Sequence, residues 1–169
     1  MPPSFRPSSD KVLIPMADLV GLRSSPLFAG MSDAEISSLA RMCSEKVIPE
    51  GMTIFLENMP GESLYLVQRG AVKVSKMITE GEEKILVVLG PEEIFGEMAL
   101  LDAAPRTATA RVAEDATLLC MRRSDFETLS EQNPALALKL TRNIIRIFSR
   151  RIRENNEEFR KMLLWSLGK

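Results

Sequence analysis

The feature that most constrains the fold is a series of short apolar runs between Lys46 and Arg122. The runs are KVI, TIFLE, LYLVQ, AVKVSKM, KILVVL, TATARV and ATLLCMR, and each has the length of a β strand. Glycine or proline stands at many of the joints, and Gly51, Gly61, Gly70 and Gly81 fall where turns are expected. Several strands of this length and spacing predict a β sandwich or roll.

The sequence before this region divides into an arm and a helix. Residues 1–22 carry prolines and serines without a clear period, so we expect an arm that is at most partly ordered. The segment Ser32–Cys43 predicts a helix, because Ser32 can cap its start and Glu35 lies three residues further on. Its apolar residues share one helical face: Ile36, Leu39 and Met42.

Helical patterns return after the last apolar run. In SDFETLSEQ, Ser124 is a possible N-cap with Glu127 three residues later. Pro134 stands where the first turn of a helix tolerates proline, and a long helix over residues 135–164 is expected. Its apolar residues form a stripe: Leu136, Leu140, Ile144, Ile147, Ile152, Phe159 and Met162.

The composition excludes several classes of function. The chain of 169 residues is 45% hydrophobic, enough for a buried core, and its net charge of -1 gives no general attraction to nucleic acid or acidic membranes. The absence of histidine removes Ser-His-Asp and Cys-His nucleophilic sites and the common zinc sites, so an enzyme is not expected. Cys43 and Cys120 lie in apolar segments and are expected to be reduced core residues. No apolar run could span a bilayer and the start lacks a signal-peptide core, so we expect a soluble cytoplasmic protein without membrane contact.

The candidate chemistry lies in one stretch, FGEMALLDAAPRTATARV, which covers residues 95–112. EMALL can form one helical turn whose free N–H groups, near Gly96 and Glu97, could hold an anion. Arg106 can add a bidentate charge-assisted contact, and the Glu97 carboxylate is an acceptor suited to a ribose hydroxyl. Gly96 and Ala99 keep the backbone approachable. Residues on preceding strands could supply apolar walls for a base: Val74, Leu86 and Val87.

Each of these residues also has a structural interpretation. Arg106 alone could be a surface charge at the end of a loop, and Glu97 alone could be a helix cap. Thr107 could be only a strand residue, and Val74, Leu86 and Val87 are core residues first. The spacing of Glu97 and Arg106 around one helical turn nevertheless favours ligand binding.

The stretch resembles the phosphate-binding cassette of the cyclic nucleotide-binding domain family, with its pattern FGE-x-ALL…PR-[STA]-A-[TS]-x-x. The likeness extends over about residues 27–156 and includes the helix before the barrel, GESLYLVQRGAVKV, the terminal helices and the Asn-Pro pair at 133–134. The resemblance, which is to domains of the catabolite activator and protein kinase A regulatory type, implies an α+β, mainly β fold. That fold is an eight-stranded β-roll or jelly-roll barrel with the cassette, an N-terminal helix and a long C-terminal helix. One departure is Glu92, which replaces the glycine usually found four residues before Gly96.

The resemblance also implies residue roles. Glu97 would bind the ribose 2′-hydroxyl, and Arg106 would pair with the exocyclic oxygens of the cyclic phosphate. Phosphate oxygens would also accept from backbone N–H groups around Met98, Ala99 and Thr107. The Thr107 hydroxyl could bond the ligand as well, and Ala108 completes the ligand-binding part of the motif.

We divide the chain into an arm (1–22), the cyclic nucleotide-binding barrel with flanking helices (23–133) and a C-terminal helix (134–169) that serves as lid or dimer contact. This helix carries many basic residues, which form either a solvated face or a partner or membrane surface. They are Lys139, Arg142, Arg146, Arg150, Arg151, Arg153, Arg160 and Lys161. Asn155 and Asn156 align with family positions that reach the base.

These observations predict a cyclic nucleotide receptor without catalysis, with cyclic AMP as first ligand and cyclic GMP also accepted. Thr107 could bond the exocyclic amine of a syn guanine. The chain ends at Lys169, too soon for a helix-turn-helix, so no sequence-specific DNA binding is expected. Its output would pass to an unknown protein partner or to a homodimer formed through the apolar stripe from Ile144 to Phe159. The alternative is an interaction domain that keeps the barrel without binding nucleotide.

Overall fold

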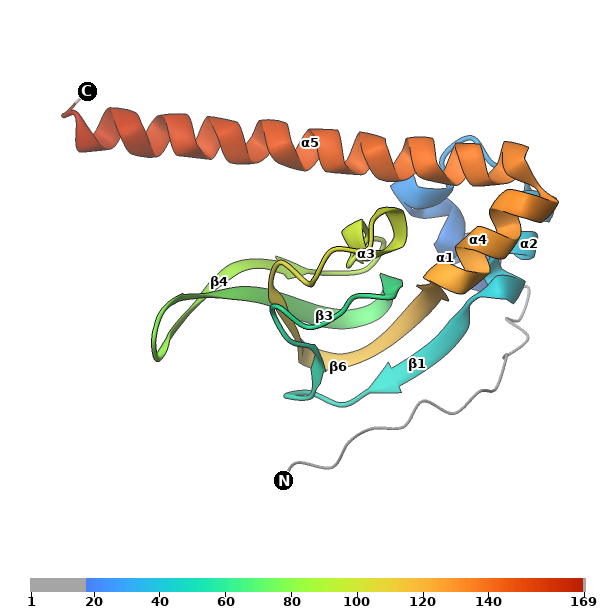
Figure 1. Cartoon of the computed structure of the whole chain (residues 1–169), viewed down its shortest axis with the longest axis horizontal. Helices are drawn as coiled ribbons and strands as arrows, with labels where there is room; N and C mark the ends of the chain where they lie inside the picture. Colours follow the sequence, from blue (N-terminus) through green and yellow to red (C-terminus); the bar gives the residue numbers. More distant parts are fainter. Residues whose placement is uncertain (1–17, 169) are drawn as a thin grey trace.

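The computed structural model describes residues 18–168, which form a β-roll flanked by helices (Figure 1). The helices are α1 (Asp18–Ser24), the 3-10 helix η1 (Pro26–Phe28), α2 (Asp33–Met42), α3 (Met98–Leu101), α4 (Arg123–Gln132) and α5 (Pro134–Ser166). The strands are β1 (Ser44–Ile48), β2 (Thr53–Phe55), β3 (Ser63–Thr79), β4 (Glu82–Leu89), β5 (Ile94–Phe95) and β6 (Thr109–Arg122). Of the expected arm, residues 1–17 lie outside the described part of the chain, and residues 18–22 belong to α1.

All strand pairs are antiparallel, in the order β1-β6-β3-β4, with β2 paired to β6 and β5 paired to β3. The jelly-roll class implied by the sequence is confirmed, but residues 18–168 contain six strands rather than eight. The difference arises because LYLVQ and AVKVSKM run together in β3, while TATARV and ATLLCMR run together in β6. Register shifts between Val67 and Val72 bend this long pair without interrupting it.

The core consists of two apolar clusters, one on each side of the sheet. Inside the roll lie eight buried side chains: Val67, Val72, Leu89, Phe95, Ala110, Val112, Ala116 and Leu118. Outside it, the helices pack on the other face of the strands, and this cluster joins Leu100 of α3 to Leu129 of α4 and Leu140 of α5. Cys43 and Cys120 are buried and free, and burial raises the pKa of Cys43 well above its ordinary value.

Of the two N-caps predicted from the sequence, the one at α2 is confirmed and the one at α4 is wrong. Ser32 and Glu35 form the expected capping box at α2. Ser124 does not cap α4, because that helix already begins at Arg123 and its N-cap residue, Arg122, makes no side-chain cap bond. No helix in residues 18–168 combines the length and the apolar character needed to cross a membrane.

The apolar stripe of α5 is continuous in the sequence but not in its packing. Leu136, Leu140, Ile144 and Ile147 are buried against the body of the protein, whereas Ile152, Phe159 and Met162 are exposed. In Figure 1 the second half of α5 extends away from the helical end of the molecule. The first half of the stripe therefore packs in the core, and the second half forms an exposed apolar face.

Candidate functional site

The candidate site is a cavity of about 380 Å³ between the cassette (residues 95–112), strands β3 and β4, and helix α5. Eleven of the twelve predicted ligand-binding or lid residues line it: Val74, Leu86, Val87, Gly96, Glu97, Met98, Ala99, Arg106, Thr107, Ala108 and Asn155. Asn156 is exposed and does not line the cavity. A volume of this size suits one small ligand.

The chain is folded tightly around Arg106. Its backbone N–H donates to the Met59 carbonyl at 2.8 Å, and its carbonyl accepts from the Asn58 N–H at 2.8 Å. Gly96 has φ +71, and a Cβ there would lie 2.6 Å from an Arg106 nitrogen and 2.9 Å from the Ser63 carbonyl. A Cβ on Gly61 would lie 3.0 Å from Arg106 Nε. Both glycines are therefore needed for the guanidinium to fit where it does.

The guanidinium of Arg106 is buried without a full set of partners. The residue is 7% exposed, and one terminal nitrogen donates to the Gly96 carbonyl at 3.2 Å. Nε is buried with no hydrogen-bond partner among the described residues. Burial lowers the pKa of Arg106, with Tyr65 and Glu97 acting in the opposite direction, yet an arginine stays charged in a protein. A buried cation with an unsatisfied donor is costly, and an anion in the cavity would relieve that cost.

An aromatic cluster supports this cation. The Phe55 ring lies 4.0 Å from the guanidinium carbon of Arg106, measured to the ring centroid, in cation–π geometry. Tyr65 and Phe95 complete the cluster, with 5.1 Å between their ring centroids. Burial is also the largest cause that raises the pKa of Tyr65, to about 12. The floor of the site is therefore apolar and largely buried, and electrostatic attraction to an anion is stronger in such surroundings than in water.

Glu97 and Arg151 connect the cassette to α5. Glu97 is 8% exposed, and its Oε1 lies 3.5 Å from a terminal nitrogen of Arg151. The other terminal nitrogen of Arg151 donates to the Ile94 carbonyl. The sequence placed Arg151 only among the basic residues of the helix and missed this contact. Its helical spacing from Ile144 and Ile147 was the available signal, because residues three and four apart share one face.

Glu92 occupies the position where the family usually has glycine, and the turn is preserved. Glu92 has φ 73, which is left-handed backbone that favours glycine. Its carbonyl accepts from the Ser25 hydroxyl at 2.8 Å, and its N–H donates to the Val67 carbonyl at 2.9 Å. These bonds hold the residue in the required conformation, so the departure does not displace the cassette.

A larger cavity, of about 490 Å³, lies between α1 and strands β1, β3 and β6. Its charged lining consists of Glu45, Arg69 and Glu92, and its cation, Arg69, is exposed rather than buried. The smaller cavity is the stronger candidate, because only there does a buried cation with an unsatisfied donor meet a nearly buried carboxylate and an apolar wall.

Together, the roll and the site have the features of a class of protein, the small-ligand receptor domains: one cavity is lined by a buried cation, a buried carboxylate and an apolar wall. A family model described as "Cyclic nucleotide-binding domain" matches residues 45–133, more than half of the chain. The chain therefore belongs to the cyclic nucleotide-binding domain family, as its cassette sequence predicted.

Individual relatives agree with this assignment. The "Cyclic AMP receptor protein" of Thermus thermophilus is 36% identical over 137 residues, which cover 81% of this chain and 62% of that protein. The N-terminal domain of a transcriptional regulator from Streptomyces coelicolor A3(2) superposes with a TM-score of 0.69 at 35% identity, covering 82% of this chain and 94% of that one. The regulatory domain of Toxoplasma gondii PKA, solved with cAMP, has a TM-score of 0.59 at 34% identity, covering 65% and 42% of the two chains.

These relatives also bear on two expectations from the sequence, that the chain does not bind DNA and that it is not an enzyme. The chain spans about three fifths of the length of the first curated relatives that it matches. Because they include transcriptional regulators, the expectation of no DNA binding gains no support. The relatives are mostly regulatory proteins, although the family's domain also occurs in an enzyme, "Glutaminase 1" of Bradyrhizobium diazoefficiens, which is 31% identical over 133 residues.

Proposed function

We propose that this chain binds cyclic AMP in the cassette cavity and reports its presence through α5. The observation that carries the proposal is the buried Arg106, whose Nε has no partner within residues 18–168 and whose guanidinium lines a cavity that Glu97 also lines. A cyclic phosphate would supply the missing acceptor, and charge-assisted bonds of this kind are the strong ones. The relative solved with cAMP supports this choice of ligand.

In the proposed complex the two ends of the nucleotide meet different chemistry. The phosphate lies against Arg106 and the backbone of the cassette, and the ribose 2′-hydroxyl donates to Glu97. The base lies along Val74, Leu86 and Val87, which form the apolar wall of the cavity. Acceptors for the exocyclic amine of adenine come from α5, where Glu154, Asn155 and Glu158 line the same cavity.

The signal would begin at Glu97. Its carboxylate already contacts Arg151 of α5, so a ribose hydroxyl that bonds Glu97 changes the partner of an α5 residue. A ligand that contacts α5 better in one helix position shifts the population towards that position. The proposed output is this movement of α5 relative to the roll.

A homodimer through α5 would extend this output to a second chain. Six exposed apolar residues of α5 are spaced at intervals of three, four and seven, the spacing of a coiled-coil seam. They are Leu138, Ile145, Phe148, Ile152, Phe159 and Met162. Asn155 falls in the same seam, so dimer formation would also affect a residue of the cavity.

Isothermal titration of the nucleotide-free protein with cyclic AMP, cyclic GMP and 5′-AMP tests the proposal. We expect cyclic AMP to bind most tightly, cyclic GMP to bind within about a hundredfold of it, and 5′-AMP to bind weakly, where each tenfold is 1.4 kcal/mol. No binding of either cyclic nucleotide would refute the receptor function and favour a domain that keeps the roll as an interaction surface. Sedimentation with and without cyclic AMP tests the dimer.

A further inference from the structure

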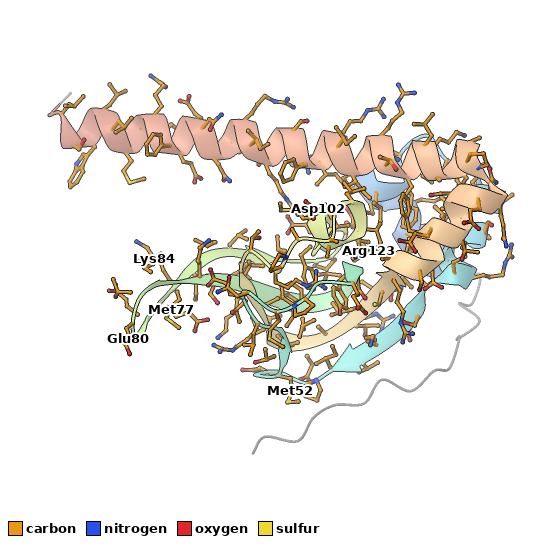
Figure 2. All side chains as sticks on the ribbon, in the orientation of Figure 1. Met52, Met77, Glu80, Lys84, Asp102 and Arg123 are labelled. Carbon is orange, nitrogen blue, oxygen red and sulfur yellow. The ribbon has the colours of Figure 1, made fainter. Side chains whose placement is uncertain are left out.

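Arg123, outside the cavity, bonds several backbone carbonyls near the cassette. It is the first residue of α4, and its Nε donates to the Ala99 carbonyl at 2.8 Å. One terminal nitrogen donates to the carbonyls of Gly61 and Asp102, each at 2.8 Å, and also to that of Ala99. Figure 2 labels Arg123 and Asp102 in the region between α3 and α4.

These carbonyls belong to the segments that form the phosphate side of the site. Ala99 and Asp102 lie in α3 and at its C-cap, where carbonyls lack partners within the helix and carry partial negative charge. Helix α3 has four residues, too few to be stable by itself, so its position depends on outside contacts. Gly61 packs directly against Arg106. One guanidinium thus fixes both the cassette helix and the loop that confines Arg106.

The same residue connects these segments to the terminal helices. Arg123 begins α4, and α4 packs against α5 through the cluster that contains Leu129, Leu136 and Leu140. Leu100 of α3 enters that cluster too. A shift of α3 therefore reaches α4 by an apolar contact at Leu100 and by a polar contact at Arg123.

We propose that Arg123 is a positioning residue that couples the cassette helix to α4 and α5, an inference that rests on the proposed function. Arg123 does not line the cavity. It holds α3 in the position that completes the cassette, and it transmits a movement of α3 to the terminal helices. Its neighbour Arg122 is exposed and provides a matched control with the same charge.

The first measurement is hydrogen–deuterium exchange of the nucleotide-free protein, comparing wild type, Arg123→Ala, Arg123→Lys and Arg122→Ala. Arg123→Ala should speed exchange of the α3 amides, at residues 99–102, by about tenfold or more, with the amides of β3 and β6 unchanged. Lysine keeps the charge but lacks the planar fork that spans several carbonyls, so Arg123→Lys should recover only part of the protection. Arg122→Ala should match wild type.

The second measurement repeats the exchange at saturating cyclic AMP. We expect Arg123→Ala to raise the Kd about three- to thirtyfold, the range for residues that influence a site without touching its ligand. At saturation its α5 amides should respond less than those of wild type. A purely structural role would lower the melting temperature yet leave this saturated response intact.

Two results would overturn the inference: α3 exchange in Arg123→Ala equal to that in Arg122→Ala, or an undiminished α5 response at saturation. A wild-type protein that binds no cyclic nucleotide is a different failure, because it refutes the proposed function. The α3 exchange of the nucleotide-free variants then decides alone whether Arg123 holds the cassette helix.

Discussion

Two arginines line the same cavity but are held in opposite ways. Arg106 stands on the roll, is 7% exposed, and has a buried Nε that finds no partner in the part of the chain that the structure describes. Arg151 stands on α5, its side chain is 27% exposed, and it is already paired with Glu97 and the Ile94 carbonyl. A buried cation left short of partners is suited to capture an anion. A cation with partners on a separate helix is suited to report a change in those partners.

The largest effect should come from removing the unsatisfied cation. Arg106→Ala should weaken cyclic AMP binding by about 2–5 kcal/mol, because the phosphate charge would then be buried without its counterpart. Calorimetry measures this loss, and Arg111→Ala, which removes an arginine outside the cavity, is the control. Unchanged affinity in Arg106→Ala would contradict the assignment of Arg106 to the phosphate.

Glu97, which stands between the two arginines, should come next. Glu97→Ala should weaken binding by about 1–3 kcal/mol, because a ribose hydroxyl loses its acceptor. Glu97→Gln keeps one acceptor oxygen and should lose less. The affinity lost in Glu97→Ala should be smaller for 2′-deoxy cyclic AMP, which lacks this hydroxyl, than for cyclic AMP. An equal loss for both nucleotides would show that Glu97 does not bond the ribose.

Arg151→Ala should have a smaller effect on affinity. The Arg151–Glu97 pair is long and partly exposed, and such pairs contribute about 0–1 kcal/mol. The ligand-induced change in α5 exchange should nevertheless diminish, while Arg153→Ala on the exposed face should preserve it. A loss of affinity as large as that of Arg106→Ala would abolish the contrast between the two arginines.

The smallest effect should fall on the choice of base. Thr107→Ala should weaken cyclic GMP binding by about 0.5–1.5 kcal/mol more than cyclic AMP binding. The reason is that the exocyclic amine of a syn guanine can donate to the Thr107 hydroxyl, whereas adenine has no amine at that position. Competitive titration of both nucleotides against wild type and variant measures the difference. Equal losses would place base selection elsewhere, with the α5 residues Glu154, Asn155 and Glu158 as the next candidates.

The sequence by itself determined the features that depend on local order. Turn residues between short apolar runs predicted the roll, the Ser32–Glu35 pair predicted the start of α2, and the cassette spacing brought Glu97 and Arg106 together. These features follow from patterns within a few residues, and short-range sterics and hydrogen bonding suffice to produce them. Eleven of the twelve predicted site residues line one cavity, but those outside the cassette, Val74, Leu86, Val87 and Asn155, are brought there by the packing of β3, β4 and α5.

Only the tertiary structure decided what each helix face meets. The periodicity of α5 shows which residues share a face, but not that Ile144 is buried, that Ile152 is exposed or that Arg151 reaches Glu97. Likewise, nothing near Arg123 in the sequence indicates that its guanidinium bonds carbonyls more than twenty residues away. Such contacts depend on how distant segments pack, because the energy of a buried charge or an apolar face is set by its surroundings rather than by its neighbours along the chain.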